Sequence, residues 1–435
     1  MAFQPLIACP HCACMHRRLP IEAGAIALCT RCGSPLYRQS GISLRGWLAL
    51  VSAALIIFII ANCFPIATLA TKGLTVNATL VDALALTWRQ GHEFVAIMTG
   101  LFAFGFPLGQ ILFLFWALRA LLSRRLPDDF HYGLRVLRTI SAWSMIPVLL
   151  LGILVAIVKL SGMAALTVGP GLWAFGALSV MMTILSRVSA HRLWRYAEDA
   201  GLVPASGALL RKGDTPAACL ACGYVQPLAH NSGNACMRCR APLHRRKVDP
   251  DARVWAFLIA AAILYIPANV LPVMNVRLPT GVTSHTILGG VVELWRLGSW
   301  DLAIIVFVAS VVVPMTKLFA LAVLMVKRRW QGPLVQRQRT RLYELVEFVG
   351  QWSMLDVFVV ILLSSMADFP GVSQITAGPG AASFGVVVIL TMFAAMSFDP
   401  RLGWDEAVKE KVDMRNIPET NLNAEPGHRV PRNNA

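Results

Sequence analysis

The stretch LRGWLALVSAALIIFIIANCFP, residues 44–65, decides the fold of this chain. Arg45 is its one charged residue, and its length matches the roughly 20 apolar residues that a helix needs to cross a bilayer. A similar stretch, VWAFLIAAAILYIPANVLP, occupies residues 254–272 and ends on the same Ala-Asn-x-x-Pro pattern. Together the two stretches predict a membrane protein built from a repeated unit.

The composition supports this interpretation. Of the 435 residues, 56% are hydrophobic and 14% are charged, whereas about 25% are charged in an ordinary soluble domain. The net charge is nevertheless +16, from 39 Lys and Arg against 23 Asp and Glu. This excludes disordered, collagenous and disulfide-rich secreted chains. No nucleic-acid partner is expected, because the basic residues follow membrane topology instead of gathering on one folded face.

Eight segments are long and apolar enough to be membrane spans. They are 44–64, 94–120, 139–160, 172–190, 254–274, 301–326, 345–367 and 382–398. With these spans, 33 of the 39 Lys and Arg residues lie on one side of the membrane, in 1–47, 119–138, 187–253, 327–341 and 399–435. The other side carries Lys72, Arg89, Lys159, Arg277 and Arg296. The positive-inside rule therefore predicts that both termini and the 187–253 insert are cytoplasmic.

The chain repeats itself at an offset of 207–210 residues. The four cysteines Cys9, Cys12, Cys29 and Cys32 recur as Cys219, Cys222, Cys236 and Cys239. Further collinear matches are Asn62 with Asn269, Trp88-Arg89 with Trp295-Arg296, Pro107 with Pro314, Trp143-Ser144-Met145 with Trp352-Ser353-Met354, and Gly169-Pro170-Gly171 with Gly378-Pro379-Gly380. Each unit is therefore expected to be a cysteine domain followed by four helices, in a parallel repeat.

The predicted fold class is an all-α polytopic membrane protein with a tandem repeat of a cytoplasmic zinc ribbon and a four-helix transmembrane bundle. The expected divisions are a first ribbon at 1–43, a first transmembrane module at 44–198, a second ribbon with linker at 199–250, a second module at 251–400 and a disordered cytoplasmic tail at 401–435.

The cysteine spacing predicts two structural zinc sites. CxxC-x16-CxxC opens the chain and CxxC-x13-CxxC lies in its middle, and two CxxC turns bring four thiolates into a tetrahedron around Zn²⁺. A dithiol redox pair, an iron–sulfur site and disulfides are the alternatives, and a reducing cytoplasm disfavours the last. His11 and Cys14 crowd the first site, so an exchange of ligands there stays open. Cys63 is expected to be a buried apolar residue.

Two ionisable residues lie deep in predicted spans, where such groups are costly and often functional. Lys317 and Asp356 are the expected partners, with Ser310 and Thr391 beside them. The first repeat has Gln110, Pro147, Ala103 and Met182 at the corresponding positions. The pair is either a buried ion pair that fixes helix packing or a protonation switch, since burial and mutual attraction act in opposite directions on its proton equilibria.

Two further repeated motifs have structural interpretations. Asn62 and Asn269 precede prolines near span ends, where the amide can cap freed backbone groups. The Gly-Pro-Gly motifs are expected to be helix starts. No motif indicates a covalent reaction: GxxxxGK[ST], GxSxG and HExxH are all missing from the sequence, and we expect a protein that is not an enzyme.

The doubled cysteine domain and helical bundle, with the motifs above and the ending Ser397-Phe398-Asp399-Pro400-Arg401, resemble the paraquat-inducible protein A family over roughly residues 5–405. The resemblance implies tetraspanin- or claudin-like bundles in the inner membrane of a Gram-negative bacterium. It also implies an MCE-domain periplasmic tunnel as partner, phospholipids as cargo and a role in outer-membrane integrity. Proton-motive force is the implied energy source, acting through a polar network in the second module. Two alternatives stay open: a scaffold that anchors the tunnel without transport, and a thiol or zinc stress sensor.

Overall fold

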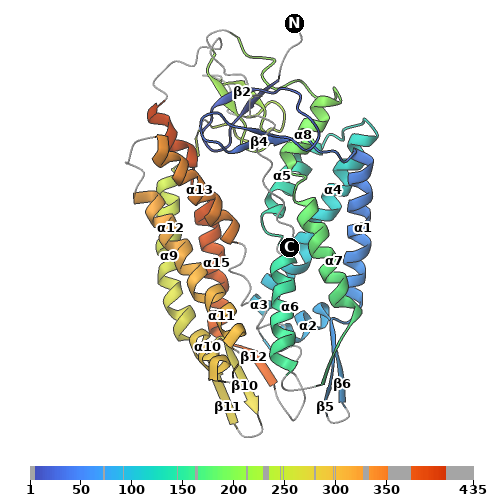
Figure 1. The fold of residues 1–435 in the computed structure, drawn as a ribbon, viewed down its shortest axis with the longest axis vertical. Helices are drawn as coiled ribbons and strands as arrows, with labels where there is room; N and C mark the ends of the chain where they lie inside the picture. The colour runs from blue at the N-terminus through green and yellow to red at the C-terminus, as the bar shows by residue number, and fades with distance from the viewer. Residues whose placement is uncertain are drawn as a thin grey trace.

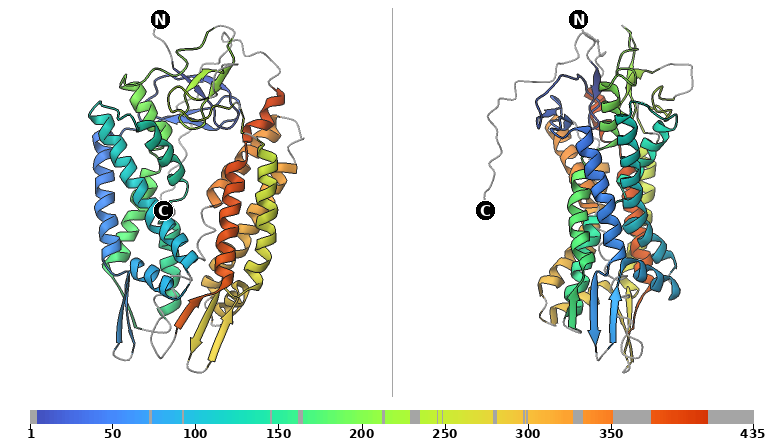
Figure 2. Two further views of the ribbon diagram at one scale, coloured as in Figure 1. Left: turned by 180° about the vertical axis from the view of Figure 1, so that it is seen from behind. Right: turned by 90° about the vertical axis from the view of Figure 1, so that its right-hand side faces the viewer.

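The computed structural model of the chain describes residues 5–407 except 72–73, 92, 145, 162–164, 212–213, 229–234, 245, 248, 279–280, 297, 299, 327–332 and 351–373. It contains two helical bundles that stand side by side (Figure 1). Small cysteine-containing domains cover the bundles at one end, and strands extend from them at the other (Figure 2). We call these the ribbon end and the sheet end.

The first bundle and its sheet come from the first half of the chain. The elements are α1 (Leu44–Cys63), β5 (Ala67–Thr71), β6 (Leu74–Ala78), α2 (Leu80–Arg89), α3 (Glu93–Gly100), the π-helical turn η1 (Leu101–Gly105), α4 (Phe106–Leu122), α5 (Phe130–Ser141), α6 (Ile146–Ser161), β7 (Ala165–Val168), α7 (Pro170–Leu185) and α8 (Ala190–Asp199). Helix α1 packs between α4 and α7, and α6 lies against α7.

The second half repeats this order. The elements are α9 (Pro250–Val270), β10 (Met274–Leu278), β11 (Gly281–His285), α10 (Ile287–Arg296), α11 (Trp300–Phe307), the π-helical turn η2 (Val308–Val312), α12 (Val313–Val326), α13 (Pro333–Gly350), β12 (Gln374–Ala377), α15 (Pro379–Ser397) and the 3₁₀ helix η5 (Pro400–Ala407). Helix α15 packs along α9, as α7 does along α1, and α12 contacts α9, α13 and α15.

Local sequence explains where the long helices begin and end. The Ser43 hydroxyl accepts from the Gly46 N–H and caps α1, which stops before Pro65 because a residue preceding proline disfavours helical geometry. Pro170 and Pro379 occupy the first turns of α7 and α15, where a missing N–H costs nothing. The Gly-Pro-Gly motifs are therefore helix starts, as predicted.

The expectation of an all-α fold is wrong at the sheet end. Each half has a three-stranded antiparallel sheet there, in the order β6-β5-β7 and β11-β10-β12. The strands are short, and β7 and β12 pair with strands about 100 residues earlier in the chain. Sequence periodicity cannot reveal such non-local pairing, since five-residue strands carry little signal of their own.

The two Gly-Pro-Gly motifs also join each bundle to its sheet. The Gly169 and Gly171 N–H groups donate to the carbonyls of Ile66 and Pro65, both at 3.0 Å. Gly378 and Gly380 donate in the same way to Val273 and Pro272, at 2.7 and 3.0 Å. A Cβ on Gly169 would lie 2.1 Å from the Pro65 oxygen, and one on Gly378 would lie 2.2 Å from the Pro272 oxygen. Only glycine allows two backbones to approach this closely.

The described residues include five helices that are long and apolar enough to cross a membrane. They cover Leu44–Cys63, Ala96–Leu122, Phe130–Val155, Pro250–Val270 and Pro379–Leu402. Helices α7 and α8, bent by 53° relative to each other, make a sixth if they are counted as one span, and Ser310–Val326 is a shorter apolar helix. The predicted span 345–367 lies largely outside the described residues, so the count of eight stays a prediction.

The three two-stranded sheets at the ribbon end belong to two cysteine domains. The first ribbon contains β1 (Leu6–Ala8), β2 (Met15–Arg17), β3 (Ile26–Leu28) and β4 (Pro35–Arg38). The second ribbon contains β8 (Pro216–Ala218) and β9 (Val225–Pro227). The first residues of the predicted disordered tail are ordered, because η5 folds against the first ribbon with Trp404 only 3% exposed. Residues 408–435 lie outside the described part of the chain.

Candidate functional sites: two cysteine clusters and an intramembrane lysine

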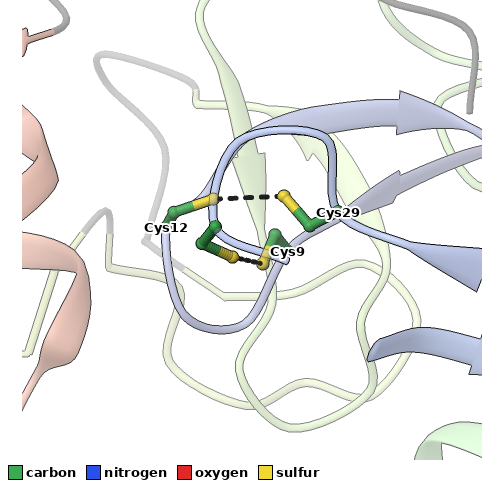
Figure 3. Close-up of side chains that lie close together, drawn as sticks. Cys9, Cys12 and Cys29 are labelled. Atoms are coloured by element: carbon green, nitrogen blue, oxygen red, sulfur yellow. Dashed lines mark hydrogen bonds between the residues drawn. The ribbon is translucent and has the colours of Figure 1, made fainter. Parts of the chain in front are cut away.

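The eight predicted cysteine ligands form two buried clusters. In each cluster the four sulfur atoms lie within 4.8 Å of one another. In the first, Cys9 and Cys12 are each 3.5 Å from a sulfur of the second CxxC turn (Figure 3). In the second, the corresponding separations are 3.5 and 3.6 Å. All eight are free thiols.

This donor set fits a tetrahedral metal ion. Four sulfurs at about 2.3 Å from Zn²⁺ would have edges of about 3.8 Å, close to the separations observed. Four thiolates packed this tightly would repel one another without a cation at their centre. Each cluster can therefore hold a metal ion through four protein ligands, which leaves no open position for a substrate and suits a structural role.

A histidine that the sequence did not single out lies beside the first cluster. His16 is fully buried on β2, and its Nε2 lies 3.3 Å from Cys29 Sγ. A ring nitrogen at this position can donate to a metal-bound thiolate and orient it. The matching residue of the second ribbon is Gln226, whose Oε1 accepts from the Met237 N–H at 2.9 Å. The two residues that were expected to compete as ligands, His11 and Cys14, are not members of the four-sulfur cluster.

The first ribbon packs on the second bundle, although the chain runs from it into the first. Its hydrophobic core includes Trp404 of η5. The Arg31 guanidinium lies 4.9 Å from the Trp404 ring, and its Nη2 donates to the Trp404 carbonyl at 3.2 Å. Glu344 of α13 accepts from Ser34 Oγ at 3.1 Å and lies 3.5 Å from His11 Nε2. The first ribbon also contacts the first bundle: Arg192 donates to the Arg38 carbonyl at the ribbon's exit, and Arg18 forms a 2.6 Å ion pair with Asp199 of α8.

The second ribbon packs on the first bundle. Its cysteines share a hydrophobic core with Trp194 of α8. Arg238 lies over the rings of Tyr224 and Trp194, at 4.3 and 5.8 Å, and forms a buried ion pair of 2.9 Å with Glu198. On α5, Arg138 donates to the Leu220 carbonyl. The first ribbon is therefore held mainly by the second bundle, through α13 and η5. The second ribbon is held by the first bundle, through α5 and α8.

Burial and nearby positive charges lower the pKa of one histidine of α8, beside the second ribbon. A Cβ on Gly223, the residue after Cys222, would lie 3.1 Å from the His191 ring, so the two pack closely. Burial, followed by the nearby guanidinium groups of Arg138 and Arg195, lowers the pKa of His191 to about 4. His191 is therefore neutral at the ribbon interface at physiological pH.

The Phe398-Asp399-Pro400-Arg401 ending binds the end of α15 to the chain segment that leads into α9. Asp399 accepts from Arg401 Nε and Nη2 at 2.8 and 2.7 Å, and from the Lys247 N–H at 3.1 Å. The Lys247 ammonium donates to the carbonyls of Met396 and Phe398. A cation on the last carbonyls of a helix is favourable, so the motif closes the second bundle at the ribbon end.

Three of the four predicted network residues lie buried in the second bundle. Lys317 of α12 is 3% exposed, and its Nζ has no hydrogen-bond partner among the described residues. Ser310 and Thr391 are also buried and donate within their own helices, to Val306 O at 2.6 Å and Val388 O at 2.8 Å. Asp356 lies outside the described residues, so its pairing with Lys317 stays a prediction.

The corresponding region of the first bundle is neutral. Gln110 takes the place of Lys317 and is buried, as are Ala103 and Met182. Asn62 and Asn269 each donate from the side-chain amide to the carbonyl four residues earlier, at 2.8 and 2.9 Å. These carbonyls lie inside α1 and α9, so the capping of freed groups at the helix ends stays a prediction. Cys63, expected to be buried, is instead exposed, as a lipid-facing apolar residue would be.

Comparison with known proteins agrees with these features. The family model for paraquat-inducible protein A matches residues 44–198 and 252–408. The chain belongs to this family. The resemblance predicted from the sequence is thereby confirmed, and the apolar helices together with family membership identify a multi-pass inner-membrane protein.

Three relatives show how far the similarity extends. The chain is 32% identical to intermembrane transport protein PqiA of Escherichia coli K12 over 405 residues, which cover 92% of this chain and 95% of the relative. It is 30% identical to lipophilic envelope-spanning tunnel protein A of the same organism, over 91% and 90%. It is 29% identical to a probable intermembrane transport protein of Haemophilus influenzae, over 93% and 97%. No solved structure matches the chain. The relatives are named as transport proteins and not as enzymes.

Proposed function

We propose that this protein is the inner-membrane subunit of a phospholipid transport system and exchanges lipids with a periplasm-spanning MCE-domain tunnel. Two observations support the proposal: the names of relatives that align over nearly the whole chain, and a buried lysine present in one half only. A buried ammonium group inside an apolar bundle is costly, and such groups mark transport or proton pathways.

The proposed topology has eight spans, with both termini and both ribbons in the cytoplasm. The distribution of Lys and Arg supports it, because the ribbon end carries most of the basic residues of the connecting segments. The sheet end then faces the periplasm, where the tunnel partner would receive lipid. The proposed metal is Zn²⁺, one ion per Cys₄ cluster, which stabilises the ribbons that connect the two bundles.

The energy source in this proposal is the proton-motive force. Lys317 and Asp356, with Ser310 and Thr391 as neighbours, form the polar network of the second bundle. Proton uptake and release by the pair would change its net charge, and a change of charge inside a low-dielectric bundle biases helix packing strongly. The first bundle, with Gln110 in place of the lysine, would support the working half without titrating.

Lipid transfer from proteoliposomes to the purified tunnel partner tests this function. Wild type is compared with Lys317→Met and Asp356→Asn, after insertion, metal content and partner binding have been verified for each. Loss of transfer in both variants supports the proposal. If wild type transfers no lipid while it binds the partner, the protein is a scaffold that anchors the tunnel. Equal transfer by all three proteins would make the pair a packing element only.

A stress-sensing role for the cysteines is the second candidate, and the cluster geometry disfavours it. All eight sulfurs are buried, whereas redox-sensing thiols are exposed and low in pKa. Retention of both metal ions under oxidants that leave the protein folded would exclude the sensor.

A further inference from the structure

Both halves contain a π-helical turn at the same place. It covers Leu101–Gly105 in the first half and Val308–Val312 in the second, and the helix that follows has proline as its second residue in both cases, Pro107 and Pro314. Single π turns are rare and often occur at functional sites. Two of them at matching positions indicate that the turn is a retained part of the fold.

Proline explains the wider turn. In a regular α-helix the N–H of residue 314 would donate to the Ser310 carbonyl, but proline has no N–H and its ring collides with that carbonyl. The helix relieves the collision by widening, so the Val313 N–H donates to Val308 five residues earlier. The Phe106 N–H donates to Leu101 in the same way.

Neither the α-helical nor the π-helical pattern provides a main-chain donor for one carbonyl of the widened turn. The Ala309 carbonyl could accept from residue 313 in an α pattern or from residue 314 in a π pattern. The Val313 N–H is already directed to Val308, and Pro314 has none. A carbonyl in an apolar bundle needs a partner, since an unsatisfied one costs several kcal/mol (roughly) in a membrane. The Phe102 carbonyl is in the same position in the first half.

In the second half, a polar group is available to complete this site. Helical side chains lean toward the N-terminus and carbonyls point toward the C-terminus, so the Lys317 side chain extends back toward the turn. The backbones of Ala309 and Lys317 are eight residues apart, about 12 Å along the axis. The Lys317 Nζ and the Ala309 oxygen are closer than this, because the lysine side chain leans toward the N-terminus and the carbonyl points toward the C-terminus. Ser310 and Lys317 are both buried, and the Lys317 Nζ has no partner among the described residues.

We infer that the π turn at Val308–Val312 is a binding site for water inside the second bundle. The water accepts from the Lys317 ammonium and donates to the Ala309 carbonyl. The Ser310 hydroxyl donates to Val306 O, so its lone pairs remain as a further acceptor. A buried water needs two to four polar partners (about three on average), and this turn supplies three. Pro314 is the positioning residue, because it frees the carbonyl.

The water site gives Lys317 a partner for proton exchange. Its role in transport rests on the proposed function. Gln110 occupies the matching position in the first half, and an amide cannot exchange protons in this way. The two prolines therefore form a matched pair, with the same effect on the backbone and a titratable side chain nearby in one half only.

The experiment compares Pro314→Ala with Pro107→Ala in the full-length protein in lipid nanodiscs. Alanine restores the N–H and allows a regular helix. Lys317 is kept in both variants, and alkylation of its amine by acrylonitrile is followed by peptide mass spectrometry. Since the ammonium must lose its proton to water before the amine can react, we expect alkylation to slow about tenfold or more with Pro314→Ala. Pro107→Ala should change the rate by less than about twofold.

Lipid transfer is measured in parallel. Slower alkylation together with lost transfer in Pro314→Ala alone supports the site. Unchanged alkylation overturns it even if transfer falls, and so does an equal effect of Pro107→Ala. If wild type transfers no lipid, the proposed function fails, yet the alkylation rates still decide whether the turn holds water. Metal content and insertion of both variants serve as the folding control.

Discussion

The first bundle buries a neutral Gln110 at the position where the second bundle buries Lys317, yet the backbones around the two residues follow the same rules. Both halves place a π turn before a proline, an asparagine that donates to its own helix before a second proline, and a Gly-Pro-Gly turn against that proline's carbonyl. The comparison teaches that backbone geometry and buried charge are under separate constraints. Proline and glycine fix the backbone geometry, and a single side chain changes the buried charge.

The ribbon ends of the two bundles differ more. The first bundle ends in α8, a ten-residue helix, and the second ends in an eight-residue 3₁₀ helix. Each nevertheless presents a tryptophan, Trp194 or Trp404, to the arginine that precedes the last cysteine of a ribbon, Arg238 or Arg31. The same type of contact is therefore made from two different backbones.

The largest expected effect tests which bundle each ribbon stabilises. Cys29→Ser should lower the metal content from two ions per chain to about one, because three thiolates bind the ion far more weakly than four. Hydrogen exchange should then rise in α13 and η5, whereas Cys236→Ser should raise it in α5 and α8. Cys14→Ser is the control and should keep both ions. If Cys29→Ser instead sped up exchange only in α1 of the first bundle, the packing of the first ribbon on the second bundle would be contradicted.

A smaller effect tests whether the backbone rules are equal in the two halves. Gly169→Ala and Gly378→Ala should each reduce the free energy of unfolding by about 3 kcal/mol or more, because the new Cβ collides with a carbonyl that cannot move freely. Thermal unfolding in detergent measures this. Gly176→Ala is the matched control, since nothing lies within 4 Å of a Cβ there. A tolerated substitution in one half would show that the halves are not equivalent at their sheets.

The two arginine–tryptophan contacts should differ in strength. Arg238→Ala leaves the Glu198 carboxylate buried without its counter-ion, with only the Ser206 N–H still donating to it, and should cost about 3 kcal/mol. Arg31→Ala loses a cation–π contact and a hydrogen bond and should cost about 1–2 kcal/mol. Thermal unfolding of both variants at equal metal content decides the order. Equal losses would mean that the Glu198 pair adds nothing to the stacking.

The smallest effect concerns pH at the second ribbon. The pKa of His191 is about 4 in the folded protein and about 6.5 in an unfolded chain, so the unfolded state binds the extra proton first. Stability should therefore fall as pH drops below about 6.5, by about 1–2 kcal/mol by about pH 5.5. His191→Gln should remove this part of the pH dependence. Both proteins are measured at each pH, so that weaker metal binding in acid affects them equally. Identical pH profiles would falsify the assignment of this pH dependence to His191.

The sequence by itself determined the repeat, the cysteine clusters, most span positions and the helix starts. These follow from local rules: CxxC turns bring sulfurs together within a few residues, apolar length predicts a span, and proline marks a first turn. The burial of Lys317 also followed from its place in an apolar segment. His16 was missed, because a histidine four residues after Cys12 has no spacing that distinguishes it from a surface residue.

Only the tertiary structure decided which parts meet. The sheets form between strands separated by about 100 residues along the chain, and the first ribbon docks on the second bundle although the chain runs from it into the first. Trp404 reaches the first ribbon across more than 360 residues. Such contacts depend on the complementary shapes and buried surfaces of whole elements, which no local pattern encodes. The π turns belong to the same class, since proline permits either a kink or a widened turn and the surrounding bundle selects between them.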